Sequence, residues 1–365
     1  MSRRVELGQA PRTEAGAFFQ RRLDGLPDVF DVVAFPRWKW PVIRQCFPGK
    51  KLRFVTARTL PEEARCIVVW GMAAVPEGVS PTARILRVED GFLRSVGLGA
   101  ELVRPMSWVV DTRGIYYDAT CESDLEWILA NTTFRAQWIA RASALRHRII
   151  GAGLTKYNVG ARHWTRPPEA RHVILVPGQV ESDASIAYGA AGARHNMALL
   201  RHVREHHPDA YVVYKPHPDV AARLRILGQD EDQARRWCDE VVADVSMGEL
   251  LDAVDEVHVM TSLAGFEALL RGKTVVCHGQ PFYAGWGLTR DMHPHPRRVR
   301  KLGLDELVAG ALILYPTYLG QDGRNLVTPE QALDALSAWK TRKGGKDPWW
   351  QEIYRFFLRR FIGVR

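Results

Sequence analysis

Short runs of β-branched and aromatic residues alternate with stretches of helical periodicity along most of this chain of 365 residues. Near-continuous apolar runs between helices are typical of parallel strands whose sheet is covered on both faces. The pattern therefore predicts an α/β fold. The expected strands are residues 29–35, 52–55, 66–70, 85–88 and 108–111 in the first series, and residues 173–176, 210–214, 240–243, 256–260 and 274–277 in the second.

A proline-containing stretch at residues 165–168 separates the two series. Consecutive prolines cannot continue a helix, so this stretch is typical of a linker. The chain length also fits two domains of roughly 100–200 residues each. We therefore expect one Rossmann-like domain over residues 1–160 and a second over residues 165–342.

Composition and charge exclude several classes of protein. Hydrophobic residues make up 46% and charged residues 25% of the chain, as in soluble globular proteins. The five cysteines are widely spaced without a C-x-x-C pair, which argues against a disulfide framework or a zinc ribbon. We find neither a signal sequence nor an apolar run of about 18 residues, so we expect a cytoplasmic protein, or one peripheral to the inner membrane. The net charge of +9 favours nucleic acid, anionic lipid or an acidic substrate as a partner, without choosing among them.

The C-terminal segment, residues 343–365, combines an aromatic stripe with arginines. Trp350, Phe357 and Phe361 follow helical spacing, and Arg355 and Arg359 supply charge. This pattern predicts an amphipathic helix. It can lie on an anionic membrane surface or dock on the body of the protein.

Polar loops follow several of the expected strands, where ligands of open parallel sheets bind. The Asp183 carboxylate can act as a nucleophile or base, or it can cap a helix. His217 lies between two prolines that fix its backbone, although it can also belong to an ordinary turn, and Lys215 beside it suits a phosphate or carboxylate. Thr261 or Ser262 begins a helix whose N-terminus can hold an anion or can be simply capped.

An acidic triplet at residues 230–232 has the D-x-D spacing of metal-bound nucleotide-sugar sites. It lies in a charged helical stretch rather than at a strand end, so we expect it to face solvent. No metal site is predicted.

Taken together, the motifs resemble the capsule polysaccharide biosynthesis family of the KpsC type, the retaining β-Kdo glycosyltransferases. The last matching segment, Tyr-Ala-Gly-Trp-Gly within residues 280–287, is the most specific. Family members often carry two such modules, whereas this chain has room for one. The matching segments occur in the order of the family at residues 89–95, 156–158, 179–189, 215–218, 261–267 and 280–287.

The resemblance implies a GT-B-like fold, in which two Rossmann-type domains with parallel sheets face each other across a cleft, the first on the acceptor side and the second binding the nucleotide sugar. It implies transfer from CMP-Kdo to a Kdo-terminated glycolipid or polysaccharide, by double displacement through a covalent aspartate adduct and without a cofactor. Asp183 falls on the nucleophile, His217 is expected at the leaving phosphate or the donor carboxylate, and Glu89 is expected to activate the acceptor. The substrate-binding residues that the matching segments imply are Arg94, Ser95, Lys156, Asn158, Gln179, Ser185, Lys215, Thr261, Ser262, Glu267, Tyr283 and Trp286.

The charges of the chain agree with this resemblance. Kdo carries a carboxylate beside its anomeric carbon, so an attacking aspartate needs nearby cations, and Lys156, Arg94 and Lys215 are available. Each charge-assisted hydrogen bond contributes about 1.5–3 kcal/mol. The net charge then favours an acidic sugar nucleotide and an anionic membrane surface over nucleic acid, and the resemblance implies a lipid-linked acceptor that contains Kdo. Two alternatives remain, a non-catalytic membrane-associated scaffold of capsule assembly and a GT-B transferase that uses another activated sugar.

Overall fold

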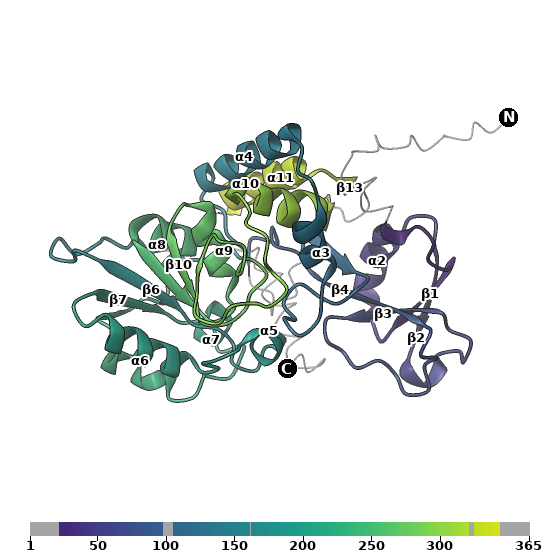
Figure 1. Cartoon of the computed structure of the whole chain (residues 1–365), viewed down its shortest axis with the longest axis horizontal. Coiled ribbons are helices and arrows are strands. Elements are labelled where there is room, and N and C mark those ends of the chain that lie inside the picture. The colour runs from purple at the N-terminus through teal and green to yellow at the C-terminus, as the bar shows by residue number, and fades with distance from the viewer. Residues whose placement is uncertain (1–21, 98–104, 161, 321–324, 344–365) are drawn as a thin grey trace.

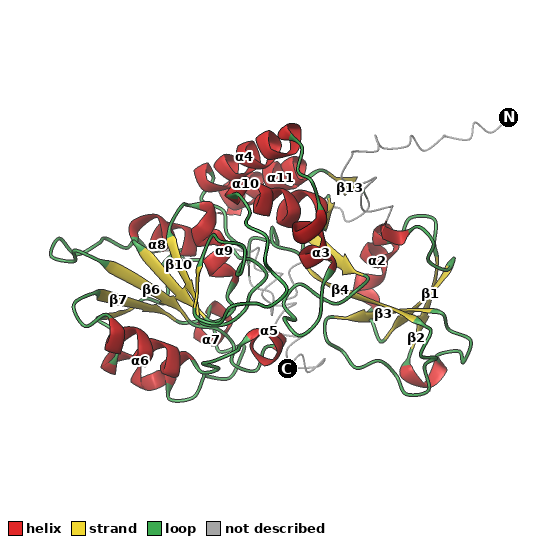
Figure 2. Ribbon diagram, viewed as in Figure 1, coloured by secondary structure: helices red, strands yellow, loops and turns green. Residues whose placement is uncertain are grey.

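The computed structural model describes residues 22–97, 105–160, 162–320 and 325–343. Two β-sheets lie at opposite ends of the molecule, and a group of helices that includes α4, α10 and α11 connects them at the top of the view (Figure 1). Strands and helices alternate along most of the chain (Figure 2). The α/β class predicted from the sequence is therefore confirmed.

The first sheet has seven strands in the order β13-β12-β5-β4-β3-β1-β2. These are β1 (Val29–Val33), β2 (Lys51–Val55), β3 (Cys66–Trp70), β4 (Arg84–Asp90), β5 (Ser107–Asp111), β12 (Pro316–Leu319) and β13 (Leu326–Val327). Strands β1 to β4 are parallel, whereas β5, β12 and β13 pair antiparallel with their neighbours. The first sheet is thus mixed rather than parallel, because an apolar run reports the burial of a strand and not its direction.

The second sheet has six strands in the order β11-β10-β9-β6-β7-β8, and every neighbouring pair is parallel, as predicted. These are β6 (Val173–Pro177), β7 (Tyr211–Lys215), β8 (Glu240–Val241), β9 (Glu256–Val259), β10 (Thr274–Cys277) and β11 (Arg290–Asp291). The connections diverge on either side of β6, so the order reverses between β6 and β9. Ligands bind at such a switch point in open α/β sheets.

Helices cover both faces of the second sheet. Helix α6 (Asn196–His206) packs on one face through Leu199, Leu200 and Val203, which form an apolar stripe. Helices α8 (Met247–Ala253) and α9 (Leu263–Leu270) pack on the opposite face. The remaining helices are η1 (Arg37–Lys39), α2 (Trp40–Cys46), η2 (Ala57–Thr59), α3 (Asp124–Asn131), α4 (Ala136–Gly151), α5 (Ala184–Gly189), α7 (Pro218–Ala221), η4 (Glu231–Arg236), α10 (Leu304–Val308), the π-helix η5 (Ala309–Leu314) and α11 (Pro329–Lys343).

The chain returns from the second sheet to the first. After β11 it passes through the half-buried helix α10 and the buried helix η5, and β12 then pairs with β5. Tyr315, between η5 and β12, donates a hydrogen bond of 2.8 Å from its hydroxyl to Asp111 Oδ2. The sheets therefore do not follow the predicted boundaries of residues 1–160 and 165–342. Pairing between strands so far apart in the chain leaves no local signature.

No helix among the described residues is both long and apolar enough to cross a membrane. The C-terminal amphipathic helix predicted over residues 343–365 lies outside the described residues, apart from Lys343, the last residue of α11.

Candidate active site

A cavity of about 530 Å³ lies between the two sheets, at the carboxyl ends of their strands. Glu89 and Arg94 reach it from the end of β4 and the loop that follows, Lys156 from the loop after α4, and Asp183 and His217 from loops of the second sheet. Five groups from four separate segments of the chain therefore face one cavity.

A side-chain amide bridges the ends of β6 and β9, the strands at the switch point of the second sheet. Gln179, which follows β6, donates from Nε2 to Thr261 Oγ1 and accepts from the Thr261 N–H, both at 2.9 Å. The Gln179 N–H in turn donates to Asn196 Oδ1 at the start of α6. Both Gln179 and Thr261 line the cavity. Their hydrogen bonds fix its floor, so Gln179 also acts as a positioning residue.

Asp183 occupies the N-cap position of α5, yet its side chain does not cap the helix. The structure gives this carboxylate no hydrogen-bond partner among the described residues. Burial raises its pKa above the ordinary value, and the charges of Arg225 and Lys156 act in the opposite direction. An unpartnered carboxylate that faces a cavity is suited to nucleophilic attack.

Glu89 lies near the end of β4. Its Oε1 atom accepts from the Asp90 N–H at 2.9 Å, and its Oε2 atom accepts from the Tyr117 hydroxyl at 3.5 Å. Burial, followed by the charge of Asp90, raises the pKa of Glu89 to about 7. Gly71 approaches closely here, at φ +47°, and a Cβ atom on it would lie 2.8 Å from Glu89 Oε2. A carboxyl group that titrates near neutral pH is suited to proton transfer.

His217 begins α7 with a hydrogen bond that fixes its tautomer. Its Nδ1 atom accepts from the Asp219 N–H at 3.2 Å. Burial, together with the charges of Lys156, Arg225 and Lys215, lowers the pKa of His217 to about 3. The ring is therefore neutral at physiological pH and carries its proton on Nε2, so it can donate one hydrogen bond to an anionic ligand.

The three predicted cations are Arg94, Lys156 and Lys215, and Lys215 has different surroundings from the other two. Arg94 bonds Asp90 Oδ2 at 2.6 Å. Burial lowers the pKa of Lys156, but the charges of Tyr157 and Asp90 outweigh it, so the pKa lies above the ordinary value. Lys215, in contrast, donates to the Ala243 and Val245 carbonyls at 3.1 and 2.7 Å, and burial lowers its pKa to about 8. Two of its three N–H groups therefore already hold the protein backbone.

Several other predicted residues hold the cavity wall. The amide of Asn158, at φ +53°, donates to the Ser95 carbonyl at 2.9 Å. Glu267 does not face solvent, since its Oε1 atom accepts from the Lys156 N–H at 2.7 Å, and burial raises its pKa to about 7. The predicted residues that line the cavity are Glu89, Arg94, Lys156, Asn158, Gln179, Asp183, Ser185, Lys215, His217, Thr261, Ser262 and Glu267.

Tyr283 and Trp286 require a correction, since the cavity lining includes neither and both are fully buried. The Tyr283 hydroxyl donates to the Ser262 carbonyl, and Trp286 Nε1 donates to the Phe282 carbonyl at 2.8 Å. A Cβ atom on Gly265 would lie 2.2 Å from the Tyr283 hydroxyl oxygen. This aromatic motif therefore supports the helix at the cavity rather than a ligand directly. Ser95 is also fully buried and outside the lining.

The cavity contains groups that sequence reasoning missed. Asp219 is 6% exposed and lines the cavity, and its Oδ1 atom has no hydrogen-bond partner among the described residues. Arg225, Tyr117 and Lys39 also line it. Asp219 follows the Lys-Pro-His-Pro motif directly, so extending that motif by one residue would have found it. Glu231 of the discounted acidic triplet is buried and accepts from the Tyr214 hydroxyl at 2.6 Å instead of facing solvent.

Fold and site together define a class, an α/β protein of two sheets with carboxylates, cations and a neutral imidazole gathered at the strand ends. The sequence model of the family described as "Capsule polysaccharide biosynthesis protein" matches residues 66–148 and 147–319. The chain belongs to this family, as its motifs predicted.

Two curated relatives are similar over most of the chain. The capsule polysaccharide modification protein LipA of Neisseria meningitidis is 43% identical over 343 residues, which cover 88% of this chain and 49% of LipA. The chain thus spans about half of the length of that relative. The lipopolysaccharide-processing protein LpsZ of Rhizobium meliloti is 43% identical over 77% of this chain and 68% of its own.

Two solved structures from Thermosulfurimonas dismutans KpsC are also similar. The β-Kdo 2,7 transferase is 40% identical, with a TM-score of 0.69, over 85% of this chain and 99% of that one. The β-Kdo 2,4 transferase is 31% identical, with a TM-score of 0.74, over 84% of this chain and 98% of that one. This chain therefore corresponds in extent to each of these solved chains.

Proposed function

We propose that the protein is a retaining β-Kdo glycosyltransferase that transfers Kdo from CMP-Kdo to a Kdo-containing, lipid-linked acceptor. The observation that carries this proposal is the shared cavity of Asp183, Glu89 and His217, in which the Asp183 carboxylate has no partner among the described residues. The names of the two Thermosulfurimonas structures support the choice of Kdo. In this proposal the two units form a GT-B arrangement across the cavity.

In the first step, an Oδ atom of ionised Asp183 forms a bond to the anomeric carbon of Kdo. The bond between that carbon and the phosphate oxygen of CMP breaks, and its electron pair leaves with CMP. The Nε2–H of neutral His217 donates a hydrogen bond to the phosphate oxygen that gains the charge. Arg225 and Lys156, whose charges favour ionised Asp183, also offset the carboxylate of the donor.

In the second step, the hydroxyl oxygen of the acceptor attacks the anomeric carbon, and the Asp183 carboxylate leaves. Glu89 takes the hydroxyl proton, for which a pKa of about 7 is well matched. Two inversions in sequence give net retention. Every proton and charge is handled by side chains of the cavity, so we propose that the reaction needs neither a metal nor a cofactor.

Soaking the purified chain with CMP-Kdo and measuring its intact mass tests the proposal. We expect the mass of one Kdo to be added to the wild type, and Asp183→Asn to lose the adduct and the transfer of Kdo to a synthetic Kdo-terminated acceptor. Asp209→Asn, at an exposed turn before β7, is the matched control. A wild type that forms no adduct and transfers no Kdo would refute the proposed activity.

A donor panel with CMP-Kdo, CMP-sialic acid and UDP-sugars separates this proposal from a GT-B transferase that uses another sugar. Calorimetry with CMP separates it from a non-catalytic scaffold, which should not bind the nucleotide. The two solved structures do not agree on the linkage, because sequence identity is higher to the 2,7 transferase and the TM-score is higher to the 2,4 transferase. Analysis of the linkage in the product therefore identifies the position that is formed.

We further propose a cytoplasmic location with peripheral membrane contact, given the lipid-linked acceptor. Liposome sedimentation of the chain with and without residues 349–365 tests the contribution of the tail. Equal pelleting of the two forms would contradict lipid anchoring through it.

A further inference from the structure

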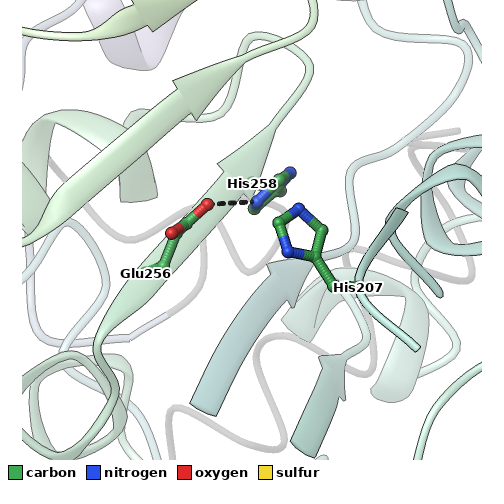
Figure 3. Close-up of side chains that lie close together, drawn as sticks. All are labelled: His207, Glu256 and His258. Carbon is green, nitrogen blue, oxygen red and sulfur yellow. Dashed lines mark hydrogen bonds and ion pairs between the residues drawn. The ribbon is translucent and has the colours of Figure 1, made fainter. Parts of the chain in front are cut away.

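A second cluster of titratable side chains lies just after the C-terminal end of helix α6 and outside the cavity lining. Figure 3 shows its three side chains close together. His207 follows the last residue of α6, and Glu256 and His258 lie two residues apart on β9. Side chains two apart on a strand project from the same face of the sheet. None of the three residues lines the cavity described above.

Glu256 and His258 are buried where apolar side chains are expected. They are 5% and 3% exposed, on a strand in the interior of a parallel sheet. Buried polar groups are nearly always partnered, and a buried charge is paired or bound to a metal. Glu256 and His258 therefore form a buried polar pair, of the kind that can bind a metal.

The hydrogen bonds of His258 define its present state. Its Nε2 atom lies 2.7 Å from Glu256 Oε1 (Figure 3), and its Nδ1 atom lies 3.0 Å from His278 Nε2. The His258 Nε2–H donates to the Glu256 carboxylate, and the other ring nitrogen faces His278.

We propose that His207, Glu256 and His258 bind a divalent first-row transition metal, with Zn²⁺ as the reference ion. One ligand atom from each residue can be chosen so that all three lie within 4.8 Å of one another. Ligands at about 2.1 Å from a tetrahedral metal lie about 3.4 Å apart, so side-chain adjustments of about 1 Å form the site. Two imidazoles and one carboxylate are a donor set that zinc uses in proteins.

The surroundings of the cluster complete this arrangement. The metal would replace the Nε2 proton of His258, and the Nδ1–H of that ring would then donate to His278, as metal-ligating histidines do to their outer partners. His172 Nε2, 3.5 Å from Glu256 Oε2, or a water can occupy the fourth position. Arg290 Nη1 is 3.9 Å from the same oxygen, but its side chain is 72% exposed and free to turn away. The metal would join the end of α6 to β9.

Titration of the metal-free full chain with Zn²⁺, followed by calorimetry, tests this proposal. We expect one Zn²⁺ per chain and a thermal unfolding temperature that rises with Zn²⁺ concentration, because the site exists only in the folded state. Co²⁺ in place of Zn²⁺ should give visible absorption bands of a tetrahedral site. His207→Ala and Glu256→Gln should each abolish these effects.

Graded variants distinguish a built site from surface binding. His278→Ala removes only the outer partner and should weaken the binding of Zn²⁺ by about 10–100-fold. His206→Ala is the matched control, because this neighbouring histidine is exposed and bonds the carbonyl of His202 in its own helix. Wild-type protein that binds no Zn²⁺, or binding unchanged in His207→Ala, would overturn the proposal. His207 is only partly buried, so that variant is expected to fold even if changes at Glu256 do not.

Discussion

Replacing Glu89 with glutamine is expected to stabilise the protein at neutral pH while it removes the proposed base. Glutamine keeps the shape of the side chain and can still accept from the Asp90 N–H. It carries no charge, however, and cannot take a proton from the acceptor. Opposite effects on stability and activity are expected where a buried carboxyl group serves function rather than folding.

The size and sign of the effect follow from the pKa of Glu89, which burial and the neighbouring Asp90 raise from 4.5 to about 7. Below pH 4.5 the group is protonated in both the folded and the unfolded state, so it does not change the free energy of unfolding. As the pH rises from 4.5 to 7 the unfolded state releases the proton first, and stability falls by about 3 kcal/mol in total. The variant lacks this loss. We expect it to gain about 1–3 kcal/mol at pH 8 and less than about 1 kcal/mol at pH 5; the attraction of Lys39 and Lys156 is already contained in the net pKa of Glu89.

Urea unfolding of both proteins at several values between about pH 5 and pH 8 measures this difference. The same preparations assayed with CMP-Kdo should show a loss of transfer by about 10²–10⁴-fold in the variant. Glu62→Gln is the matched control, because Glu62 is exposed in the loop before β3; it should change neither the stability nor the transfer activity. A Glu89→Gln protein that is no more stable than the wild type at pH 8 would refute the argument from burial.

Three further predictions follow from the cavity walls. Gly265→Ala places a Cβ atom 2.2 Å from the Tyr283 hydroxyl oxygen, so the urea midpoint should correspond to a loss of about 1–3 kcal/mol, and an unchanged midpoint would contradict this packing. Asp219→Asn should weaken CMP-Kdo binding in calorimetry by about tenfold or more, because the unpartnered Oδ1 atom is then no longer part of a charged acceptor, and equal affinity would exclude contact with the ligand. Asn158→Ala removes the donor to the Ser95 carbonyl and places alanine at φ +53°, so thermal unfolding should report a loss of about 1–2 kcal/mol, and no loss would show that the wall does not depend on this side chain.

Local patterns in the sequence predicted the strands that became β1 to β10, but not β11, β12 or β13. The expected strand at residues 66–70 is β3, and that at residues 274–277 is β10. Buried parallel strands are recognisable because they are apolar throughout. The rule that ligands bind beyond the carboxyl ends of strands then selected Glu89, Asp183 and His217, which line one cavity.

Long-range pairing and the direction of side chains could not be predicted in the same way. The antiparallel pairing of β12 with β5 joins residues about 200 positions apart, and no local residue preference encodes it. Tyr283 belongs to a distinctive motif, but whether an aromatic ring faces a ligand or the core depends on its neighbours in space. Arg225 and Lys39 reach the cavity from segments without a recognisable motif, so only the folded arrangement reveals them.

The loop at residues 155–158 explains how carboxylates from different sheets can share one site. It is tied to the first sheet by hydrogen bonds from the Ser95 and Gly97 N–H groups to the carbonyls of Lys156 and Tyr157. It is tied to the second sheet by the Lys156 N–H, which donates to Glu267 of α9. The same loop therefore bonds the segment after Glu89 and the helix that follows β9, and it places the Lys156 charge near both carboxylates. A residue first selected as a cation for the substrate thus also joins, through its backbone, the two halves of the site.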